Sequence, residues 1–543
     1  MHNLLLSIDA GTIDWSRAQF ALTAIYHWLF VPLTLGLAVI MGICETIYYK
    51  KRDDFWKKTA QFWQRLFGVN FAMGVATGII LEFEFGTNWS NYSWFVGDIF
   101  GAPLAVEGIV AFFMESTFVA VMFFGWHKVS AGFHLASTWL TGLGATISAW
   151  WILVANAWMQ YPVGCQFNPD TMRNEMTSFA EVALSPFAID KFCHTVISSW
   201  IIGAVFVVAV CCWYLLKKRE QRLALESIKI ATIVGLVASV GAAATGHKSA
   251  QSVGEVQPMK LAAMEALYNG GNGVGLTAIA WVNPLEQPNY AKEAEAPFKL
   301  EMPYALSFMA TNDMHGYVPG INDILKGYTK PDGTVEPSID EKIDRGKVAI
   351  QVLADYRRMK AKGADEGTLN NLLALLNENM PYFGYGYIRD KSEVVPFIPV
   401  NFWAFRTMVG LGCLFITFFG VLLLLVFNIP FVSIVSRRLM AALGLLDETE
   451  ADTPASGSVP VWLCWAAIIM VPLAYIASES GWLVAEFGRQ PWTIQDMLPT
   501  WAAVSDLNSG SVAVTFFLFL ILFTTMLAVE ISILLKQIKK GPK

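Results

Sequence analysis

Nine long apolar runs dominate the chain of 543 residues and constrain its fold more than any other feature. A helix needs about 20 mostly apolar residues to cross the hydrocarbon core of a bilayer. The runs have about that length or more. We therefore predict an all-α integral membrane protein with about nine transmembrane helices. The runs cover residues 18–47, 66–84, 101–126, 133–158, 187–216, 228–246, 399–428, 459–485 and 511–535.

The amino-acid composition excludes most soluble classes of protein. Only 15% of the residues are charged and 55% are hydrophobic, whereas soluble domains carry about 25% charged residues. Intrinsic disorder requires low hydrophobicity and high net charge, which is the opposite combination. The formal net charge is −6 and no long basic tract occurs, so we expect no nucleic-acid partner. The first 17 residues lack the features of a cleaved signal peptide.

Lysine and arginine are distributed unevenly between the links that join the runs. Basic residues cluster in the inner loops of membrane proteins, and every cluster here falls on one side if the chain begins outside and ends inside. We therefore predict an external N-terminus and a cytoplasmic C-terminus. The clusters contain Lys50, Lys51, Arg52, Lys57, Lys58, Lys217, Lys218, Arg219, Arg222, Arg437, Arg438, Lys536, Lys539, Lys540 and Lys543.

Residues 247–398 depart from the apolar pattern. This segment holds 34 charged residues among its 152 positions, whereas the other 391 positions hold 48. We predict a water-exposed external segment between the sixth and seventh helices, which divides the chain into 1–246, 247–398 and 399–543. Helical periodicity with charges on one face covers Ile339–Lys362, and a shorter apolar stripe covers Leu369–Leu376. A loop of this length is functional or disordered, and we favour a function.

Several side chains that are costly in a bilayer lie within the apolar runs. A charged group at the centre of a membrane helix costs about 2.5–3.5 kcal/mol on insertion scales, so each is a candidate for function. On the predicted topology His27, Glu107, His194, Met408 and Glu486 lie in the outer half of the membrane. The full set is His27, Glu107, Glu115, His194, Arg406, Met408, Glu486 and Arg489.

This set of residues is typical of a redox centre supplied with protons. Haem iron takes His or Met as axial ligands, and arginine can neutralise haem propionates because it stays charged. Glu107 and Glu115 are eight residues apart, so a helix places both on one side and Glu115 about 12 Å deeper. The simpler interpretations remain open at this stage. Each histidine alone is compatible with a hydrogen-bonded core residue, Met408 with a gap-filling core residue, and Glu486 with an ion pair to Arg489.

The remaining histidines and the cysteines give no site. The seven cysteines have no spacing typical of zinc ligands. A disulfide between Cys165 and Cys193 stays open, because sequence does not determine connectivity. Four histidines lie in loops or at run ends, and we expect them to be solvated: His127, His134, His247 and His315.

Six segments together resemble subunit I of the cytochrome bd-type quinol oxidases. The most specific is GWLVAEFGRQPW, in which Trp482, Glu486 and Arg489 occur together. The order His, Glu, His, Met, Glu along the chain agrees as well. The likeness spans all nine runs and is weakest between residues 266 and 395. The other segments are SRAQFALTAIYHWLFVPLTLG, FGTNWS, GDIFGAPLAVEG, WILVANAWMQ and KLAAMEA.

The resemblance implies a terminal oxidase of the bacterial inner membrane that oxidises a quinol and reduces O₂ to water. His194 and Met408 would be the axial ligands of a low-spin haem b, stabilised by Arg406. His27 and Glu486 would bind the two high-spin haems, and we assign His27 to haem d and Glu486 to the high-spin haem b, although family members differ in this pairing. Trp482 would pack nearby.

The resemblance also implies the proton route, the quinol site and the partners. Glu107 would lie beside the oxygen-reducing haem, with Glu115 behind it on the route from the cytoplasm. The hydrophilic segment would bind quinol, with Glu265 as proton acceptor and Lys260 as a polar partner. Without the resemblance, those two residues would be interpreted as a solvated pair. A second large membrane subunit (subunit II) and a small single-span subunit are expected, and the choice between ubiquinol and menaquinol stays open.

Two other functions compete with the oxidase. A secondary transporter could use buried Glu and His residues to bind substrate or relay protons, but the runs show no internal repeat and no paired broken helices. A purely structural membrane subunit would leave the buried charges unexplained. An absorption spectrum separates the oxidase from both.

Overall fold

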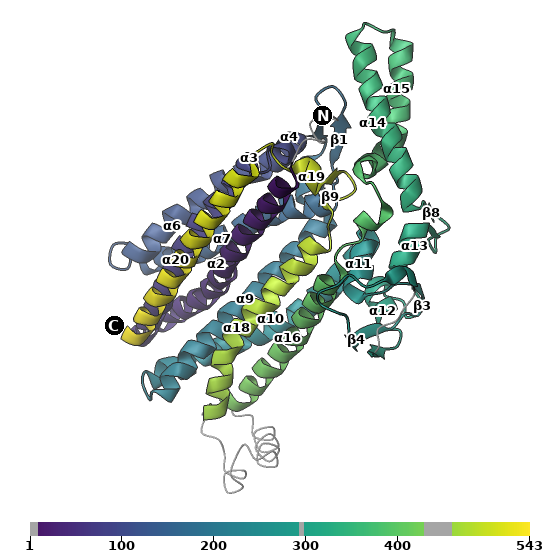
Figure 1. The fold of residues 1–543 in the computed structure, drawn as a ribbon. Helices are drawn as coiled ribbons and strands as arrows, with labels where there is room; N and C mark the ends of the chain where they lie inside the picture. The colour runs from purple at the N-terminus through teal and green to yellow at the C-terminus, as the bar shows by residue number, and fades with distance from the viewer. Residues whose placement is uncertain (1–8, 293–297, 428–458, 543) are drawn as a thin grey trace.

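The computed structural model describes residues 9–292, 298–427 and 459–542. Within these residues, nine helices are long and apolar enough to cross a membrane, as predicted. They lie alongside one another as a bundle (Figure 1). The elements that form them are α2 (Ala10–Lys51), α3 (Asp54–Thr87), α5 (Asp98–Val106) with η1 (Glu107–Phe112) and α6 (Phe113–Phe124), α7 (Ala131–Gln160), α8 (Phe179–Ala183) with α9 (Pro186–Leu216), α10 (Gln221–Val256), α16 (Ile398–Val426), α18 (Val461–Phe487) and α20 (Ser509–Lys540).

Two helices differ in shape from the apolar runs that predict them. The sixth run ends at residue 246, but α10 continues for ten further residues to Val256. The extension is mostly polar, so the apolar run does not predict it. The third run is interrupted by a π-helical segment, Glu107–Phe112. Such segments often occur at functional sites, and this one begins at a predicted site residue.

Local sequence signals explain where several helices begin. Ser130 and Ser185 accept hydrogen bonds from backbone N–H groups of the first turns of α7 and α9, and Pro186 occupies the first position of α9. Serine at an N-cap and proline at the first helical position are typical helix starts. Arg52 ends α2 in the left-handed conformation and Asp53 caps α3, so two residues reverse the chain.

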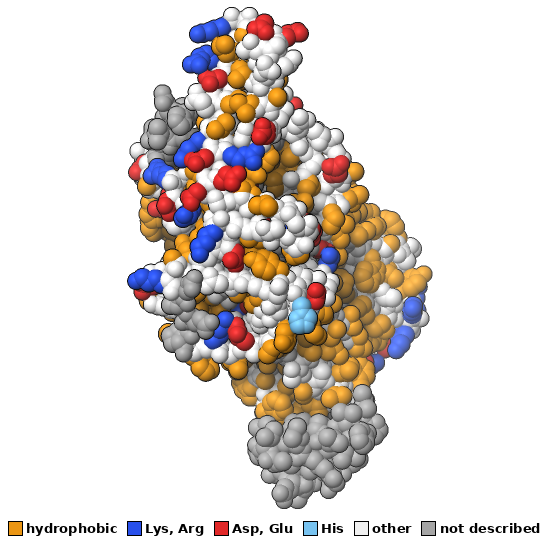
Figure 2. Space-filling model, turned by 90° about the vertical axis from the view of Figure 1, so that its right-hand side faces the viewer, with side chains coloured by type: hydrophobic (Ala, Val, Ile, Leu, Met, Phe, Trp, Pro, Cys, Tyr) orange, Lys and Arg blue, Asp and Glu red, His pale blue; other side chains and the backbone are white. Residues whose placement is uncertain are grey.

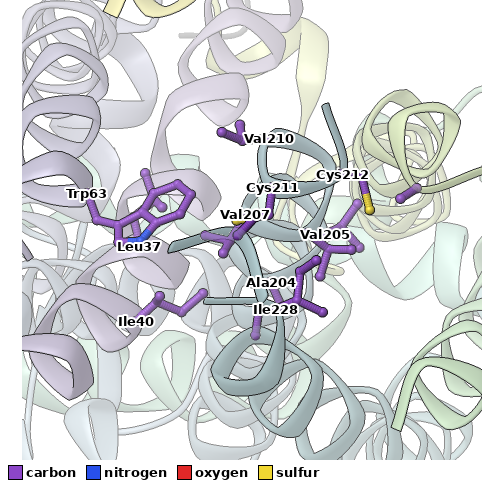
Figure 3. Close-up of a cluster of buried hydrophobic side chains, with 14 of the residues drawn as sticks. Leu37, Ile40, Trp63, Ala204, Val205, Val207, Val210, Cys211, Cys212 and Ile228 are labelled. Atoms are coloured by element: carbon purple, nitrogen blue, oxygen red, sulfur yellow. The ribbon is translucent and has the colours of Figure 1, made fainter. Parts of the chain in front are cut away.

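The core of the bundle is formed by α2, α3, α9 and α10, with contributions from α16, α18 and α20. Figure 3 shows side chains from α2, α3, α9 and α10 that meet there, among them Leu37, Trp63 and Val207. Helices α2 and α9 come very close at two glycines. A Cβ atom on Gly36 would lie 2.6 Å from the Cα atom of Gly203. Small residues at a crossing allow membrane helices to approach in this way.

The basic links meet at one end of the bundle. Arg222 forms an ion pair with Asp53 at 3.1 Å, and the Arg219 guanidinium donates a 3.1 Å hydrogen bond to the carbonyl of Lys539. The α2–α3 turn, the α9–α10 turn and the end of α20 are therefore neighbours. Arg437, Arg438 and Lys543, which belong to the same predicted clusters, lie outside the described residues.

The hydrophilic segment folds into short helices and two-stranded sheets at the opposite end. The helices predicted at Ile339–Lys362 and around Leu369–Leu376 are confirmed as α14 (Ile339–Ala361) and α15 (Glu366–Asn379). They form a hairpin that projects from the molecule (Figure 1). Its other elements are α11 (Pro258–Glu265), β3 (Gly271–Asn272), β4 (Leu276–Ala280), η2 (Tyr290–Lys292), β5 (Lys299–Met302), α12 (Ala305–Thr311), β6 (Tyr317–Val318), α13 (Ile321–Lys326), β7 (Tyr328–Thr329), β8 (Val335–Glu336), η3 (Met380–Tyr387) and η4 (Lys391–Val394).

Shorter elements close the same end of the bundle. The strand pair β1–β2 is antiparallel and contacts the hydrophilic segment through Phe167 and Phe383, whose ring centroids are 5.7 Å apart. The seven cysteines are all free, so the Cys165–Cys193 disulfide does not form. The elements are α4 (Ser90–Val96), β1 (Cys165–Asn168), β2 (Arg173–Met176), β9 (Trp492–Ile494), β10 (Leu498–Pro499) and α19 (Thr500–Ala503).

Charged and apolar side chains occupy different parts of the surface. Figure 2 shows acidic and basic side chains gathered over the hydrophilic segment, with hydrophobic side chains covering much of the surface below it. Large exposed apolar residues of the bundle include Phe124, Ile109 and Val237. This distribution is that expected of a bundle surrounded by lipid or by other membrane subunits.

Candidate functional site

His194 lies near the start of α9 and faces α10. Its Nδ1 atom is 3.1 Å from the hydroxyl oxygen of Thr245. The next residue of α10 is Gly246, where a Cβ atom would lie 3.2 Å from Cε1 of the imidazole. The threonine therefore orients the ring, and the glycine gives it room.

His27 on α2 has the same surroundings on α3. Its Nδ1 atom is 2.9 Å from the hydroxyl oxygen of Thr77. A Cβ atom on Gly78 would lie 3.0 Å from Cε1 of the ring. Both histidines thus face the tripeptide Ala-Thr-Gly on the neighbouring helix, at residues 76–78 and 244–246.

These hydrogen bonds determine which ring nitrogen carries the proton. The hydroxyl group of Thr77 donates to the carbonyl of Met73 at 3.0 Å, and that of Thr245 donates to the carbonyl of Gly241 at 2.9 Å. A hydroxyl has one proton to donate, so each oxygen accepts from Nδ1–H of its histidine. Each imidazole also hydrogen-bonds a backbone group, at Gly74 for His27 and at Ala242 for His194. Among the described residues no side chain is hydrogen-bonded to either Nε2, so the Nδ1–H form leaves that atom as a candidate iron ligand.

His134 differs from His27 and His194, and our expectation that it is solvated is wrong. We expected it to be solvated, but it is only 2% exposed. Its Nδ1 is 2.6 Å from a carboxylate oxygen of Glu45, and its Nε2 is 3.0 Å from the carbonyl of Met122. We expected solvation because His134 lies near the start of an apolar run. Its position in the sequence does not indicate these partners on α2 and α6. Both nitrogens are occupied, so His134 has no lone pair for a metal.

Met408 lies on α16 and faces α18. A Cβ atom on Gly481 of α18 would lie 3.2 Å from the Met408 sulfur. Helix α9, which carries His194, packs against α10 and α18, and α16 packs against both of these. His194 and Met408 therefore belong to one four-helix unit.

Glu486, at the end of α18, is surrounded by donors. Its carboxylate pairs with Arg489. It also accepts hydrogen bonds from the amides of Asn156 at 3.0 Å and Gln160 at 3.4 Å, both on α7. Arg489 is 6% exposed.

Two lysines extend this cluster. Lys191 donates to Asn156 at 2.9 Å and Lys260 donates to Gln160 at 2.7 Å. Burial, followed by the nearby charge of Lys191, holds the pKa of Lys260 well below its ordinary value. Together with Arg489, two lysines therefore lie around a single carboxylate, and the lowered pKa of Lys260 favours the neutral form of that lysine. We call Lys191, Lys260, Arg489 and Glu486 the cation cluster.

An aromatic contact joins the His27 region to Glu486. The rings of Trp28 and Trp482 meet edge to face with centroids 5.2 Å apart, and the indole of Trp28 donates to Ser478 at 2.7 Å. Trp28 follows His27 in sequence, and Trp482 precedes Glu486 by about one turn. The two predicted ligand positions thus lie on helices that face each other.

Glu107 and Glu115 both lie against α7. The hydroxyl group of Ser148 donates to Glu107 at 2.8 Å. A Cβ atom on Gly144, four residues earlier on α7, would lie 2.6 Å from Cγ of Glu115. Glu115 is 6% exposed. The two side chains thus contact successive turns of one helix, α7.

Glu265, at the end of α11, forms a two-point ion pair with Arg406 of α16. The nitrogen–oxygen distances are 2.6 and 3.3 Å. Glu265 is 2% exposed, and burial raises its pKa although Arg406 opposes the rise. A cavity of about 250 Å³ opens beside Glu265, lined also by Phe402 and Lys299. Arg406 is two residues from Met408, so the cavity adjoins the four-helix unit.

The structure does not bring Lys260 and Glu265 together. They are five residues apart on α11, which places them about 140° apart around its axis. Lys260 faces the cation cluster, whereas Glu265 faces the cavity. The interpretation as a solvated pair is wrong, because both side chains are buried.

Sequence analysis missed the partners that orient the candidate ligands. Thr77, Gly78, Thr245 and Gly246 carry no charge and lie on helices other than those of the histidines. The repeated Ala-Thr-Gly tripeptide was the available signal. Lys191 lies in the first turns of α9, and no sequence pattern predicts that it lies near Glu486.

The donor set fits haem on two counts. Two histidines offer a free Nε2, and Met408 offers a sulfur beside a glycine; these are the atoms that bind haem iron. The cation cluster gathers three basic side chains around one carboxylate, so an anionic group such as a haem propionate would favour their charged forms.

Comparisons with known proteins show the family of this chain. Residues 15–542 match the family model described as cytochrome bd terminal oxidase subunit I. The chain is 40% identical over 98% of its length, and 97% of the relative, to cytochrome bd-II ubiquinol oxidase subunit 1 of Escherichia coli (strain K12). It is 32% identical over 97% of its length, and 93% of the relative, to cytochrome bd ubiquinol oxidase subunit 1 of Bacillus subtilis (strain 168).

A solved structure shares the fold. The bd oxidase from Geobacillus thermodenitrificans superimposes with a TM-score of 0.71 at 21% identity, covering 98% of this chain and 99% of that one. The likeness extends over the bundle and the hydrophilic segment alike. With the family model and two relatives above 30% identity, the conclusion is direct: this chain belongs to the cytochrome bd terminal oxidase subunit I family.

Proposed function

We propose that this chain is the haem-bearing subunit of a quinol:oxygen oxidoreductase in the bacterial inner membrane, with three haems and separate paths for electrons and protons. The observation that carries the proposal is the unpaired Nε2 of His27 and His194, each held in that state by a threonine. Haem iron supplies the electron transfer and oxygen reduction. The residues of the chain supply ligation, spacing and proton transfer.

Four side chains would hold the iron atoms. His194 and Met408 are assigned to the low-spin haem b, His27 to haem d and Glu486 to the high-spin haem b. Arg406, close to Met408, stabilises the low-spin haem by its charge. The Trp28–Trp482 contact supports neighbouring positions for the two high-spin haems.

The cation cluster would bind propionate groups. Arg489 stays charged in any protein environment, and the ammonium groups of Lys191 and Lys260 are held at its side by two amides of α7. In this proposal Lys260 acts within the cation cluster, on the side of α11 turned away from the cavity beside Glu265. Its role as a polar partner of quinol stays a prediction.

Quinol oxidation would take place at the cavity beside Glu265. The carboxylate accepts a proton from the quinol hydroxyl, and Arg406 holds the carboxylate in position. Because the hydrophilic segment is assigned to the outer face, the proton leaves to the outside. The division into 1–246, 247–398 and 399–543 follows, with the middle part as the quinol-binding segment.

Protons for oxygen reduction would reach the site from the cytoplasm through Glu115 and then Glu107. Contacts of both carboxylates with α7 support one continuous path. Quinol protons leave outside and oxygen takes protons from inside, so one charge is separated per electron. Each such charge stores about 2.3 kcal/mol per 100 mV.

The same proposal includes orientation and partners. The N-terminus lies outside and the C-terminus in the cytoplasm, because the joined basic end faces inward. A second large membrane subunit and a small single-span subunit complete the enzyme. Ubiquinol or menaquinol is the electron donor.

A reduced-minus-oxidised absorption spectrum of the purified complex tests the proposal. We expect bands of haem b and a far-red chlorin band, and a featureless spectrum would eliminate haem binding. His194→Ala or Met408→Ala is expected to remove the low-spin band and quinol oxidation. Normal haem content and turnover in both variants would overturn the ligand assignment.

A further inference from the structure

A β-hairpin, β4–β5, forms one wall of the cavity beside Glu265. Strand pairing is antiparallel, with Ala280 opposite Lys299 and Ile279 opposite Leu300. Ala280 and Lys299 line the cavity. Successive side chains of a strand point to opposite faces, so Ile279 and Leu300 point away from it.

The outer face of this hairpin is apolar and exposed. Ile279, Trp281, Phe298 and Leu300 are each more than half exposed, and Trp281 pairs with Phe298 through a backbone hydrogen bond of 3.1 Å. Four large apolar side chains on one face of a small hairpin are unusual in contact with water.

The hairpin is attached to the beginning of a membrane-spanning helix. The indole of Trp403, in the second turn of α16, donates to the carbonyl of Val282 at 2.9 Å. Trp281 packs against the same indole, with centroids 6.4 Å apart. Tryptophan is enriched where membrane proteins meet the headgroup region. The apolar face therefore lies at the level where a lipid-soluble molecule would enter.

Lys299 is the cation of the cavity. Its ammonium group pairs with Glu301 at 2.5 Å, which uses one of its three donors. Two donors remain for a ligand. The cavity thus presents a buried carboxylate, Glu265, and a lysine from different elements, and Phe402 belongs to the same lining.

We propose that Lys299 binds the second oxygen of the quinol ring while Glu265 binds the first, and that the apolar face of β4–β5 guides the isoprenoid tail to the membrane. This inference rests on the proposed function, because it assigns a partner within the same quinol site. A cavity of about 250 Å³ suits a single substituted ring, so the isoprenoid tail lies outside the cavity. Lys299 is a positioning residue, since it does not take the proton.

Steady-state oxidation of decylubiquinol by the purified complex tests the role of Lys299. Lys299→Met is expected to raise KM about tenfold with little change in kcat, the effect of one hydrogen bond worth about 1.4 kcal/mol. Lys299→Arg is expected to keep KM within about threefold, because it retains a charged donor. Lys391→Met removes a lysine with a similar ion pair, to Asp340, outside the cavity, and should leave KM unchanged.

The outcomes separate this inference from the proposed function. An unchanged haem spectrum in Lys299→Met shows that the variant is folded. If wild type oxidises the quinol and Lys299→Met has the wild-type KM, the assignment of Lys299 is wrong and the proposed function stands. A fall in kcat at constant KM would also overturn it. If the wild-type complex fails to oxidise any quinol, the proposed function itself fails.

Discussion

At the scale of single residues, the second ring nitrogen distinguishes the histidines of this chain. His134 uses both nitrogens in hydrogen bonds, whereas the side-chain hydrogen bonds of His27 and His194 involve only Nδ1. All three lie in or near apolar runs, so the sequence context does not separate them. The neighbouring helix distinguishes the three histidines. It supplies a carboxylate to His134, and to His27 and His194 a threonine whose hydroxyl donates to a carbonyl of its own helix.

Thr245→Val tests this role of the threonine. The substitution removes the acceptor for Nδ1–H, so the ring loses its orientation and its preference for a free Nε2. Partners of this kind change metal affinity by about 10–100-fold. We expect a weaker low-spin haem b band in the difference spectrum, restored by Thr245→Ser. Thr525→Val removes a threonine that bonds only its own helix and should not alter the spectrum; equal bands in all variants would refute the role.

If Glu265 accepts the quinol proton as proposed, quinol oxidation depends on pH. A protonated carboxyl cannot accept the quinol proton, and burial raises the pKa of Glu265 above its ordinary value. We therefore expect kcat/KM to rise with pH through that raised pKa and to level off above it. Glu265→Gln should remove the acidic limb and lower the rate. An acidic limb that persists in Glu265→Gln would assign the titration to another group.

At the scale of elements, helix periodicity and apolar length predict most of the fold. The nine long helices and α14 and α15 follow from patterns within single segments. What the sequence could not predict are contacts between segments. The π-helical segment at Glu107 packs against α7, the polar extension of α10 contacts the end of α12 through His247, and β4 pairs with β5 across the intervening loop.

In the candidate site, too, the residue types were predictable from the sequence and the contacts between segments were not. Residue types that are costly in lipid indicated His27, His194 and Glu486, because burial of such groups requires a reason. The opposite directions of Lys260 and Glu265 were not predictable, since they depend on how α11 packs between α7 and α16.

The crossing of α2 and α9 is an element-level feature with a sharp test. A Cβ atom on Gly36 would lie 2.6–2.8 Å from backbone atoms of α9, so Gly36→Ala must push the helices apart. Overpacking of this kind costs about 1–3 kcal/mol. We expect a lower thermal unfolding midpoint and less low-spin haem. Gly420→Ala, where a Cβ atom meets nothing within 4 Å, should have neither effect; similar midpoints for both variants would show that the crossing tolerates a methyl group.

At the scale of the whole molecule, charged groups are separated along the bundle. Basic links join at one end, and the hydrophilic segment with its buried Glu265 occupies the other. Glu115 lies between Glu107 and the basic end. The arrangement suits an enzyme that takes protons from one side of a membrane and releases protons on the other.

Glu115→Gln tests this separation in the complete complex. The amide cannot carry a proton through the bundle, so oxygen consumption with quinol should fall by at least about tenfold, in line with the usual effect of losing a proton-transfer group. The haem spectrum should not change, because Glu115 is assigned no iron. Glu226→Gln, which removes a carboxylate paired with Lys229 at the basic end, provides the control. In proteoliposomes, the voltage generated per electron should stay the same while its rate of formation falls. Full turnover in Glu115→Gln would mean that protons reach oxygen by another path through the molecule.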